Sequence, residues 1–203
     1  PASISLTLDS QRRLVLRLDA DNSVTLSGFD ADAPFAGRSI DFFQSGANGP
    51  VLAYEELLGA GIRGDGTDAA EVLKGTALVD TVSGGAGDDY FVASGAGDRF
   101  IGGAGDDTFE YRIGDGQVSI VDTADDTGTN TVRFGAGITT DSVERKLRFA
   151  ESADSPTGFR LALAFDEADQ LDLGAFDPAA PESSPHAVEH FEFADGAVLS
   201  WSA

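Results

Sequence analysis

Cysteine and methionine are both absent from this chain of 203 residues. Without cysteine no disulfide can crosslink the fold, so a secreted form needs another link, such as a metal ion whose binding is coupled to folding. No stretch approaches the roughly 18–20 apolar residues of a membrane-spanning helix, and no signal-peptide pattern stands at the N-terminus. Because the chain begins with Pro1 and has no methionine, we expect a segment of a longer protein, for which a missing signal peptide is uninformative.

Basic residues are also few. Thirteen Lys and Arg stand against 35 Asp and Glu, which gives a formal net charge of −22. Such a charge excludes a nucleic-acid partner and opposes compaction through mutual repulsion. Yet 41% of the residues are hydrophobic and 14 are Phe, which is too apolar a composition for permanent disorder. This balance predicts a chain that folds when divalent cations neutralise its acidic groups.

Signatures of catalysis are missing as well. The two histidines, His186 and His190, are four residues apart, but Pro185 and the strand-like sequence after it argue against a helix that would bring both onto zinc. No serine lies in a Gly-x-Ser-x-Gly elbow. We therefore expect no enzymatic activity.

A nine-residue period is the dominant feature of the middle of the chain. Two copies of Gly-Gly-Ala-Gly-Asp-Asp, at Gly84–Asp89 and Gly102–Asp107, begin two periods apart. An acid recurs once in every period, with an apolar residue two positions after each acid: Glu71, Asp80, Asp89, Asp98 and Asp107, followed by Leu73, Val82, Phe91, Phe100 and Phe109. This pattern predicts a parallel β-roll, in which one nonapeptide makes a turn and a strand, two complete a coil, and turns two nonapeptides apart stack.

The stacked turns have the chemistry of a calcium site. Glycines adopt positive φ and turn their carbonyl oxygens inward, and the aspartate adds a hard carboxylate oxygen of the kind that Ca²⁺ prefers. We predict one calcium ion between the two Gly-Gly-Ala-Gly-Asp-Asp turns. An ordinary glycine-rich β-turn with solvated acids explains five in-phase acids less well. The predicted metal-site residues on this edge are Gly84, Gly85, Ala86, Gly87, Asp89, Gly102, Gly103, Gly105 and Asp107.

On the opposite edge of the roll the motif is degenerate. There Gly75–Asp80 is expected to face Ala93–Asp98, and both turns have lost glycines while Asp80 and Asp98 remain. These two acids predict a second, weaker calcium site, and Glu71 is expected to cap Asp89 on the first edge.

Two further predictions concern acids outside these positions. Asp88 and Asp106 occupy the variable slot of the motif and are expected to be solvated. After Glu110 the period breaks, because an acid expected near Val118 is missing. The stack is therefore predicted to end there, with Asp115 and Asp122 as candidate terminal ligands.

The flanks carry a second repeat. Residues 12–34 and 159–181 match at a constant offset, and both copies alternate apolar and polar residues around an Asp-rich turn. This pattern predicts a β-hairpin, followed in each copy by a third and a final strand. At the same offset Tyr54 and Trp201 are expected at equivalent positions of that final strand. The predicted fold is all-β, with a short parallel β-roll in residues 63–122, capped by related β-rich modules in residues 1–62 and 123–203.

Residues 66–121 resemble the repeat block of RTX (repeats-in-toxin) proteins, and both flanks resemble the β-rich module that accompanies such blocks in large haemolysins, adenylate cyclase toxins and adhesins. The resemblance implies calcium as the ligand, export by the type I secretion machinery through a parent protein, an extracellular or cell-surface location, and folding on calcium outside the cell. The expected role is a monomeric structural segment without a membrane span. A calcium-dependent module that binds a glycan or a host surface, through loops around Tyr54 and Trp201, is the alternative.

Overall fold

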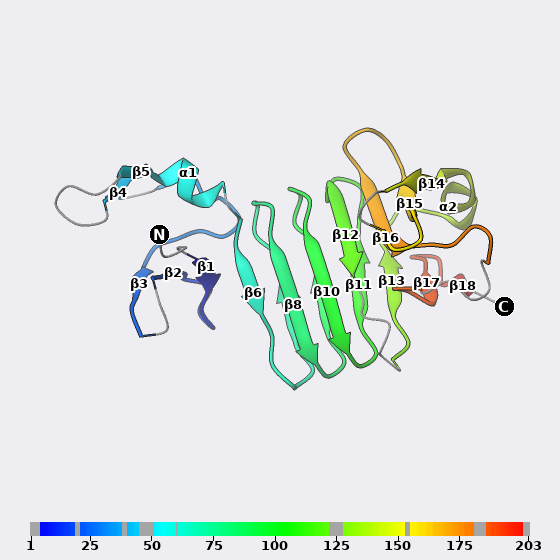
Figure 1. Ribbon diagram of the computed structural model, residues 1–203, viewed down its shortest axis with the longest axis horizontal. Coiled ribbons are helices and arrows are strands. Elements are labelled where there is room, and N and C mark those ends of the chain that lie inside the picture. Colours follow the sequence, from blue (N-terminus) through cyan, green and yellow to red (C-terminus); the bar gives the residue numbers. More distant parts are fainter. Residues whose placement is uncertain are drawn as a thin grey trace.

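The structure is a computed structural model, and it describes residues 5–18, 21–37, 40–44, 51–59, 61–121, 128–152, 155–180 and 186–200. It is mostly β, with one ten-stranded, one six-stranded and one two-stranded sheet in the described residues (Figure 1). No helix in these ranges is long and apolar enough to cross a membrane.

The centre of the molecule is a parallel β-roll in which the chain alternates between the two larger sheets (Figure 1). The parallel strands of the first sheet are β6 (Arg63–Asp65), β8 (Thr81–Ala86), β10 (Arg99–Ala104), β12 (Gln117–Val121) and β16 (Gln170–Ala175). Those of the second sheet are β7 (Val72–Lys74), β9 (Tyr90–Val92), β11 (Thr108–Tyr111), β13 (Thr131–Phe134) and β17 (His190–Glu192). The predicted parallel roll with flanking β-sheets is thereby confirmed.

Strand register shows how far the nonapeptide period extends. Partners are two nonapeptides apart through the first three coils, as in the pairs of Thr81 with Arg99 and Tyr90 with Thr108. At the next step Arg99 pairs with Ser119 and Thr108 with Thr131, so both separations exceed two nonapeptides. The prediction that the stack ends after Glu110 is therefore wrong. Losing the acid at this point removes a polar group from the turn, while Val118 and Ile120 of β12 still bury their side chains in the core.

Aromatic side chains of the repeat fill the interior of the roll. Phe91, Phe100 and Phe109 are at most 1% exposed, and the rings of Phe91 and Phe109 stack with centroids 4.9 Å apart. Strand residues alternate between the two faces of a sheet, so the residue two positions after each acid points inward. These three phenylalanines occupy the apolar position of the nonapeptide, as the period predicts.

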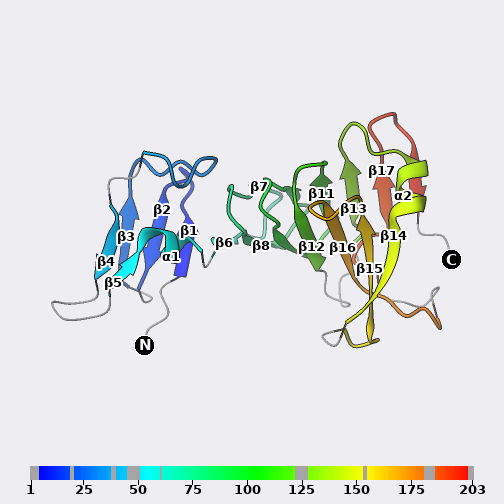
Figure 2. The same ribbon diagram turned by 90° about the horizontal axis from the view of Figure 1, so that it is seen from above.

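Antiparallel strands extend the roll at both ends (Figure 2). Before the roll lie β1 (Ser5–Leu8), β2 (Leu14–Arg17), β3 (Ser23–Leu26), the pair β4 (Phe42–Gln44) and β5 (Val51–Ala53), and helix α1 (Tyr54–Leu58). After β13 lie α2 (Thr140–Lys146), β14 (Leu147–Glu151) and β15 (Phe159–Ala164), and β18 (Val198–Ser200) pairs with β17. Strand β1 joins the roll by pairing parallel with β6, so the first sheet is continuous across the predicted boundary at residue 62.

The two flanks have the same internal strand order. Leu16 pairs with Val24 in the first flank, and Leu163 pairs with Leu171 in the second, which is the same pair at the offset of the flank repeat. One detail of the predicted repeat is wrong. Tyr54 begins helix α1 instead of ending the preceding strand, and its hydroxyl donates a hydrogen bond to the Pro34 carbonyl at 3.0 Å. Trp201, its predicted counterpart, lies outside the described residues.

Candidate metal centre

Strands β8 and β10 bring the two Gly-Gly-Ala-Gly-Asp-Asp turns into direct register, with Gly85 opposite Gly103 and Ala86 opposite Ala104. In each turn the second and fourth positions have positive φ, between 95° and 128°, and all four are glycines: Gly85, Gly87, Gly103 and Gly105. A residue with a Cβ would be strained at these places.

The first glycine of each turn is needed for a different reason. A Cβ on Gly84 would collide with the Oδ2 atom of Asp89 and with the carbonyl oxygen of Gly102. Gly102 is in the same position relative to Asp107. Each aspartate carboxylate therefore folds back over the first glycine of its own turn, and backbone carbonyl oxygens face the space between adjacent turns.

A ladder of side-chain acceptors follows this edge of the roll. The backbone N–H of Glu71 donates to Asp89 Oδ1 at 2.9 Å, and that of Asp89 donates to Asp107 Oδ1 at 2.9 Å. The ladder continues where the nine-residue count fails: Asp107 N–H donates to Asn130 Oδ1 at 2.9 Å, and Asn130 N–H donates to a Glu189 side-chain oxygen at 2.7 Å. Sequence reasoning missed Asn130 and Glu189, because neither of these steps keeps the spacing of two nonapeptides.

One carboxylate oxygen of this ladder has no donor from the protein. Asp89 is 2% exposed, and its Oδ2 atom is buried without a hydrogen-bond partner; the Oδ2 atom of Asp107 is buried at the equivalent place. Burial raises the pKa of Asp89, and the neighbouring acids Glu71 and Asp88 add to the shift. A buried acceptor without a donor is costly to the fold, and a cation between the turns would remove that cost.

The opposite edge satisfies its own carboxylates. Thr76 donates to both oxygens of Asp80, and the backbone N–H groups of Asp80 and Ser94 donate to the two oxygens of Asp98 at 3.0 and 3.2 Å. Burial, reinforced by the charge of Asp80, raises the pKa of Asp98 to about 7, and burial also raises the pKa of Asp80. Positive φ occurs here at Gly95 and Gly97, one position later than the corresponding φ values of the first edge. A cation would therefore stabilise the fold less at Asp80 and Asp98, whose carboxylate oxygens already accept hydrogen bonds, than at Asp89.

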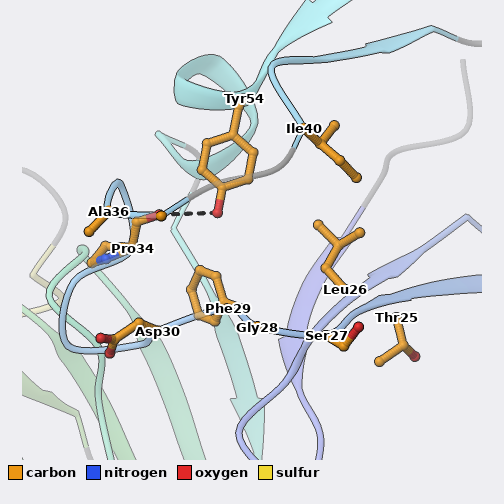
Figure 3. Close-up of a pocket in the computed structure, with 11 residues that line it drawn as sticks. Thr25, Leu26, Ser27, Gly28, Phe29, Asp30, Pro34, Ala36, Ile40 and Tyr54 are labelled. Carbon is orange, nitrogen blue, oxygen red and sulfur yellow. Dashed lines mark hydrogen bonds between the residues drawn. The ribbon is translucent and has the colours of Figure 1, made fainter.

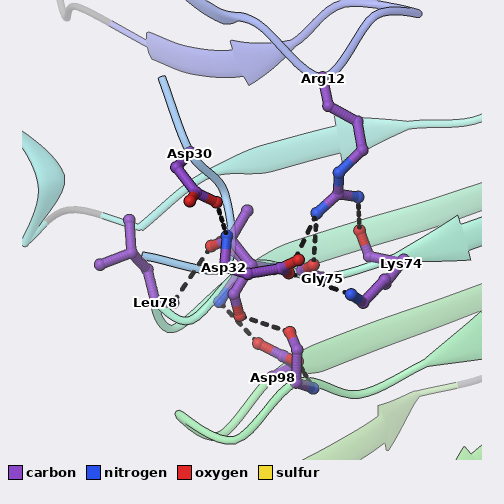
Figure 4. Close-up of polar contacts among 10 residues, drawn as sticks. Arg12, Asp30, Asp32, Lys74, Gly75, Leu78 and Asp98 are labelled. Carbon is purple, nitrogen blue, oxygen red and sulfur yellow. Dashed lines mark hydrogen bonds and ion pairs between the residues drawn. The ribbon is translucent and has the colours of Figure 1, made fainter. Parts of the chain in front are cut away.

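A fixed cation already lies beside this second edge (Figure 4). The guanidinium of Arg12, from the turn between β1 and β2, donates to the carbonyls of Lys74 and Gly75 at 3.1 and 3.2 Å. Its charge also lowers the pKa of Asp80, against the larger effect of burial. Arg12 has a φ of 57°, the only positive φ of a non-glycine residue in the described ranges. The N-terminal flank thus supplies a positive group to the first turn of the edge with the weaker motif.

The remaining predicted residues have other surroundings. Asp88 and Asp106 are exposed, as expected, but they also form an outer ladder, since Asp106 N–H donates to Asp88 Oδ1 at 2.9 Å. Asp115 accepts the N–H of Arg112 at 2.7 Å within its own turn, and burial raises its pKa. Asp122 lies outside the described residues.

Within the described residues, no three acidic or histidine side chains converge on one point. A cation at Asp89 would therefore take most of its ligands from backbone carbonyl oxygens of the two stacked turns, together with the aspartate carboxylates. Hard oxygen donors of this kind suit Ca²⁺. The residues present fit a calcium ion on this edge of the roll.

These features define a class of protein, namely a parallel β-roll whose coils are pairs of glycine- and aspartate-rich nonapeptides. A family model described as the RTX calcium-binding nonapeptide repeat, in four copies, matches residues 65–98, 74–109 and 83–118. Residues 65–118 of this chain are therefore RTX calcium-binding repeats, which confirms the resemblance of the repeat block drawn from the sequence. No curated protein matches the chain.

Proposed function

We propose that this chain is a calcium-binding RTX module that folds on calcium after type I secretion and serves as a structural segment of a large secreted toxin or adhesin. The observation that carries the proposal is the buried Oδ2 atom of Asp89, which has no protein donor and lies in a turn stacked on an identical turn. The net charge of −22 opposes folding until cations neutralise it. Calcium is scarce in the cytosol, and extracellular modules have dissociation constants on the order of 10⁻⁴–10⁻³ M, so binding outside the cell drives folding by mass action.

A calcium titration followed by far-UV circular dichroism, with calorimetry in parallel, tests this proposal. We expect a cooperative gain of β-structure as calcium is added, and a chelator should reverse it. A chain that is fully folded in chelator and indifferent to calcium would contradict the proposal.

A glycan or host-surface binding role has less support. Of the two aromatic residues around which such a site was expected, Tyr54 is only 4% exposed, and Trp201 lies outside the described residues. A glycan array probed with the calcium-loaded chain separates the two roles, because selective binding would favour the second.

A further inference from the structure

The two flanks are copies of one module, but only the C-terminal copy contacts the last coil of a roll. In the C-terminal copy, β16 pairs parallel with β12 and β17 pairs parallel with β13. The N-terminal copy has β3 in place of β16 and β4 in place of β17. In the described residues β3 is the last strand of its sheet, and β4 pairs with β5 alone. In the N-terminal copy, therefore, β3 and β4 have no roll coil beside them, whereas the equivalent strands β16 and β17 pair with the last coil of the roll.

Side chains at equivalent positions differ in burial accordingly. Leu171 of β16 lies opposite Val118 of the roll and is fully buried, whereas its equivalent Val24 is 46% exposed. Phe165 stacks on Tyr111 of the roll with ring centroids 5.7 Å apart, while its equivalent, Leu18, is 41% exposed. The module has kept apolar residues where the roll would cover them.

A hollow beside β3 gives the same indication (Figure 3). It has a volume of about 220 Å³ and is lined in part by Leu26, Gly28, Phe29 and Ile40. The equivalent residues of the C-terminal copy line a space of only about 10 Å³: Leu173, Ala175, Phe176 and Ala187. In that copy Gly174, which is next to Leu173 and Ala175 in the chain, lies beside the Ile120 carbonyl of β12, so the strand that lines this space also contacts the roll.

The N-terminal copy shows a second contact of the module on its other side. There β1 pairs parallel with β6 and so begins the first sheet of the roll. The equivalent strand β14 is the terminal strand of the same sheet at its opposite end. The two copies together show two contacts of the module: β16 and β17 pair with the last coil of a roll, and β1 pairs with the first strand of a roll.

We propose that the surface formed by β3 and β4, together with Leu18, is a docking surface for the terminal coil of a second calcium-binding nonapeptide roll. That coil would pair with β3 and β4 as β12 and β13 pair with β16 and β17. The module is then a two-sided connector between successive rolls. This inference rests on strand pairing and burial, so it can fail separately from the proposed role in secretion.

A tandem protein tests the docking surface. Strand pairing makes Leu6 equivalent to Leu147, because their partners Leu16 and Leu163 are equivalent. Residues 5–145 placed directly before residues 5–203 therefore reproduce the connection between roll and module. The internal copy of the N-terminal module should then cap the first roll, while the outer copy keeps its free edge.

Hydrogen exchange in calcium provides the measurement, and Val24→Asp in one module at a time provides the matched comparison. Peptides from β10 and β12 occur twice in the tandem protein, so they report both rolls together. We expect one slowly exchanging population in the parent tandem and in the variant with Val24→Asp in the outer module. The same substitution in the internal module should produce a second, fast-exchanging population, because it places a carboxylate where Leu171 is fully buried.

Two outcomes would overturn the proposal. A fast-exchanging population already present in the parent tandem means that the module does not cap the added roll. Identical behaviour of the internal and outer variants means that the β3 surface does not receive the coil.

Discussion

At the scale of single residues, the two carboxylate oxygens of Asp89 have different roles in the candidate site. Oδ1 accepts the N–H of Glu71 from the preceding coil and so holds the turns in register. Oδ2 has no protein donor and is buried. Asp98 on the other edge uses both oxygens within the protein. Because Asp89, unlike Asp98, has a buried carboxylate oxygen without a protein donor, the edge that carries it is expected to bind calcium more tightly than the edge that carries Asp98.

Replacing Asp89 with Asn should weaken calcium-induced folding. An amide keeps a hydrogen-bond acceptor but removes the negative charge, so we expect the calcium midpoint to rise by about tenfold or more, equivalent to about 1.4 kcal/mol. Calcium titration by circular dichroism measures the midpoint. Asp88→Asn, at the exposed neighbouring position, is the matched control and should change it little. Equal shifts in both variants would mean that total charge, and not the site, determines the response.

The pKa of Asp98 predicts a pH dependence of the calcium-free chain. Its pKa in the fold is about 7, against an ordinary value of 3.8, so between these limits the folded state holds a proton that the unfolded state has released. Lowering the pH through this window therefore stabilises the calcium-free fold, by at most about 1.4 kcal/mol per pH unit. In chelator, the folded fraction seen by circular dichroism should rise as the pH falls from about 7.5 to about 5. Asp98→Asn should flatten this dependence, and an unchanged slope in that variant would assign the effect to other groups.

At the scale of elements, the capping of the roll depends on two parallel pairings. Strands β16 and β17 return after a long excursion of the chain and extend both sheets of the roll. Leu163 and Leu171 at this junction are fully buried. The C-terminal flank is therefore part of the hydrophobic core of the roll and does not merely cover its end.

Truncating Leu171 should cost much more than truncating its copy in the other flank. We expect Leu171→Ala to lower the free energy of unfolding of the calcium-loaded chain by about 2–5 kcal/mol, since it leaves a cavity in a closed core. Val24→Ala, at a position 46% exposed, should change it by about 0.5 kcal/mol or less. Urea unfolding in calcium measures both values. Similar losses in the two variants would show that β3 is already covered in the isolated chain.

At the scale of the whole molecule, charge and site make separable contributions to folding. A formal charge of −22 is screened by any cation, whereas the stacked turns offer a specific set of oxygen ligands. The two contributions predict different responses to different ions.

Magnesium at the calcium concentration that completes folding should leave the roll mostly unfolded. Mg²⁺ requires a near-ideal octahedral geometry at about 2.0–2.1 Å and keeps its waters, which suits a gap lined by backbone carbonyls poorly. Circular dichroism at matched ionic strength, with sodium chloride as the monovalent control, makes the comparison. Equal folding in magnesium and calcium would attribute the transition to charge neutralisation alone.

The sequence by itself determined the roll, its coils of two nonapeptides and the opposed glycine–aspartate turns, because a nine-residue period specifies local φ angles and which side chains face inward. It also revealed the repeat shared by the two flanks. Only the tertiary structure showed that the stack continues past Val118, that Asn130 and Glu189 extend the acceptor ladder, and that Asp80 and Asp98 are satisfied by the protein. These features depend on pairings between distant segments, such as β13 with β17, and on donors such as Thr76. The long-range pairings are set by how the strands pack in space, and they lie beyond the point at which the nine-residue period breaks. The hydrogen bonds from Thr76 to Asp80 form within one turn, but the period specifies only the position of the acid and not the donors that its side chain meets.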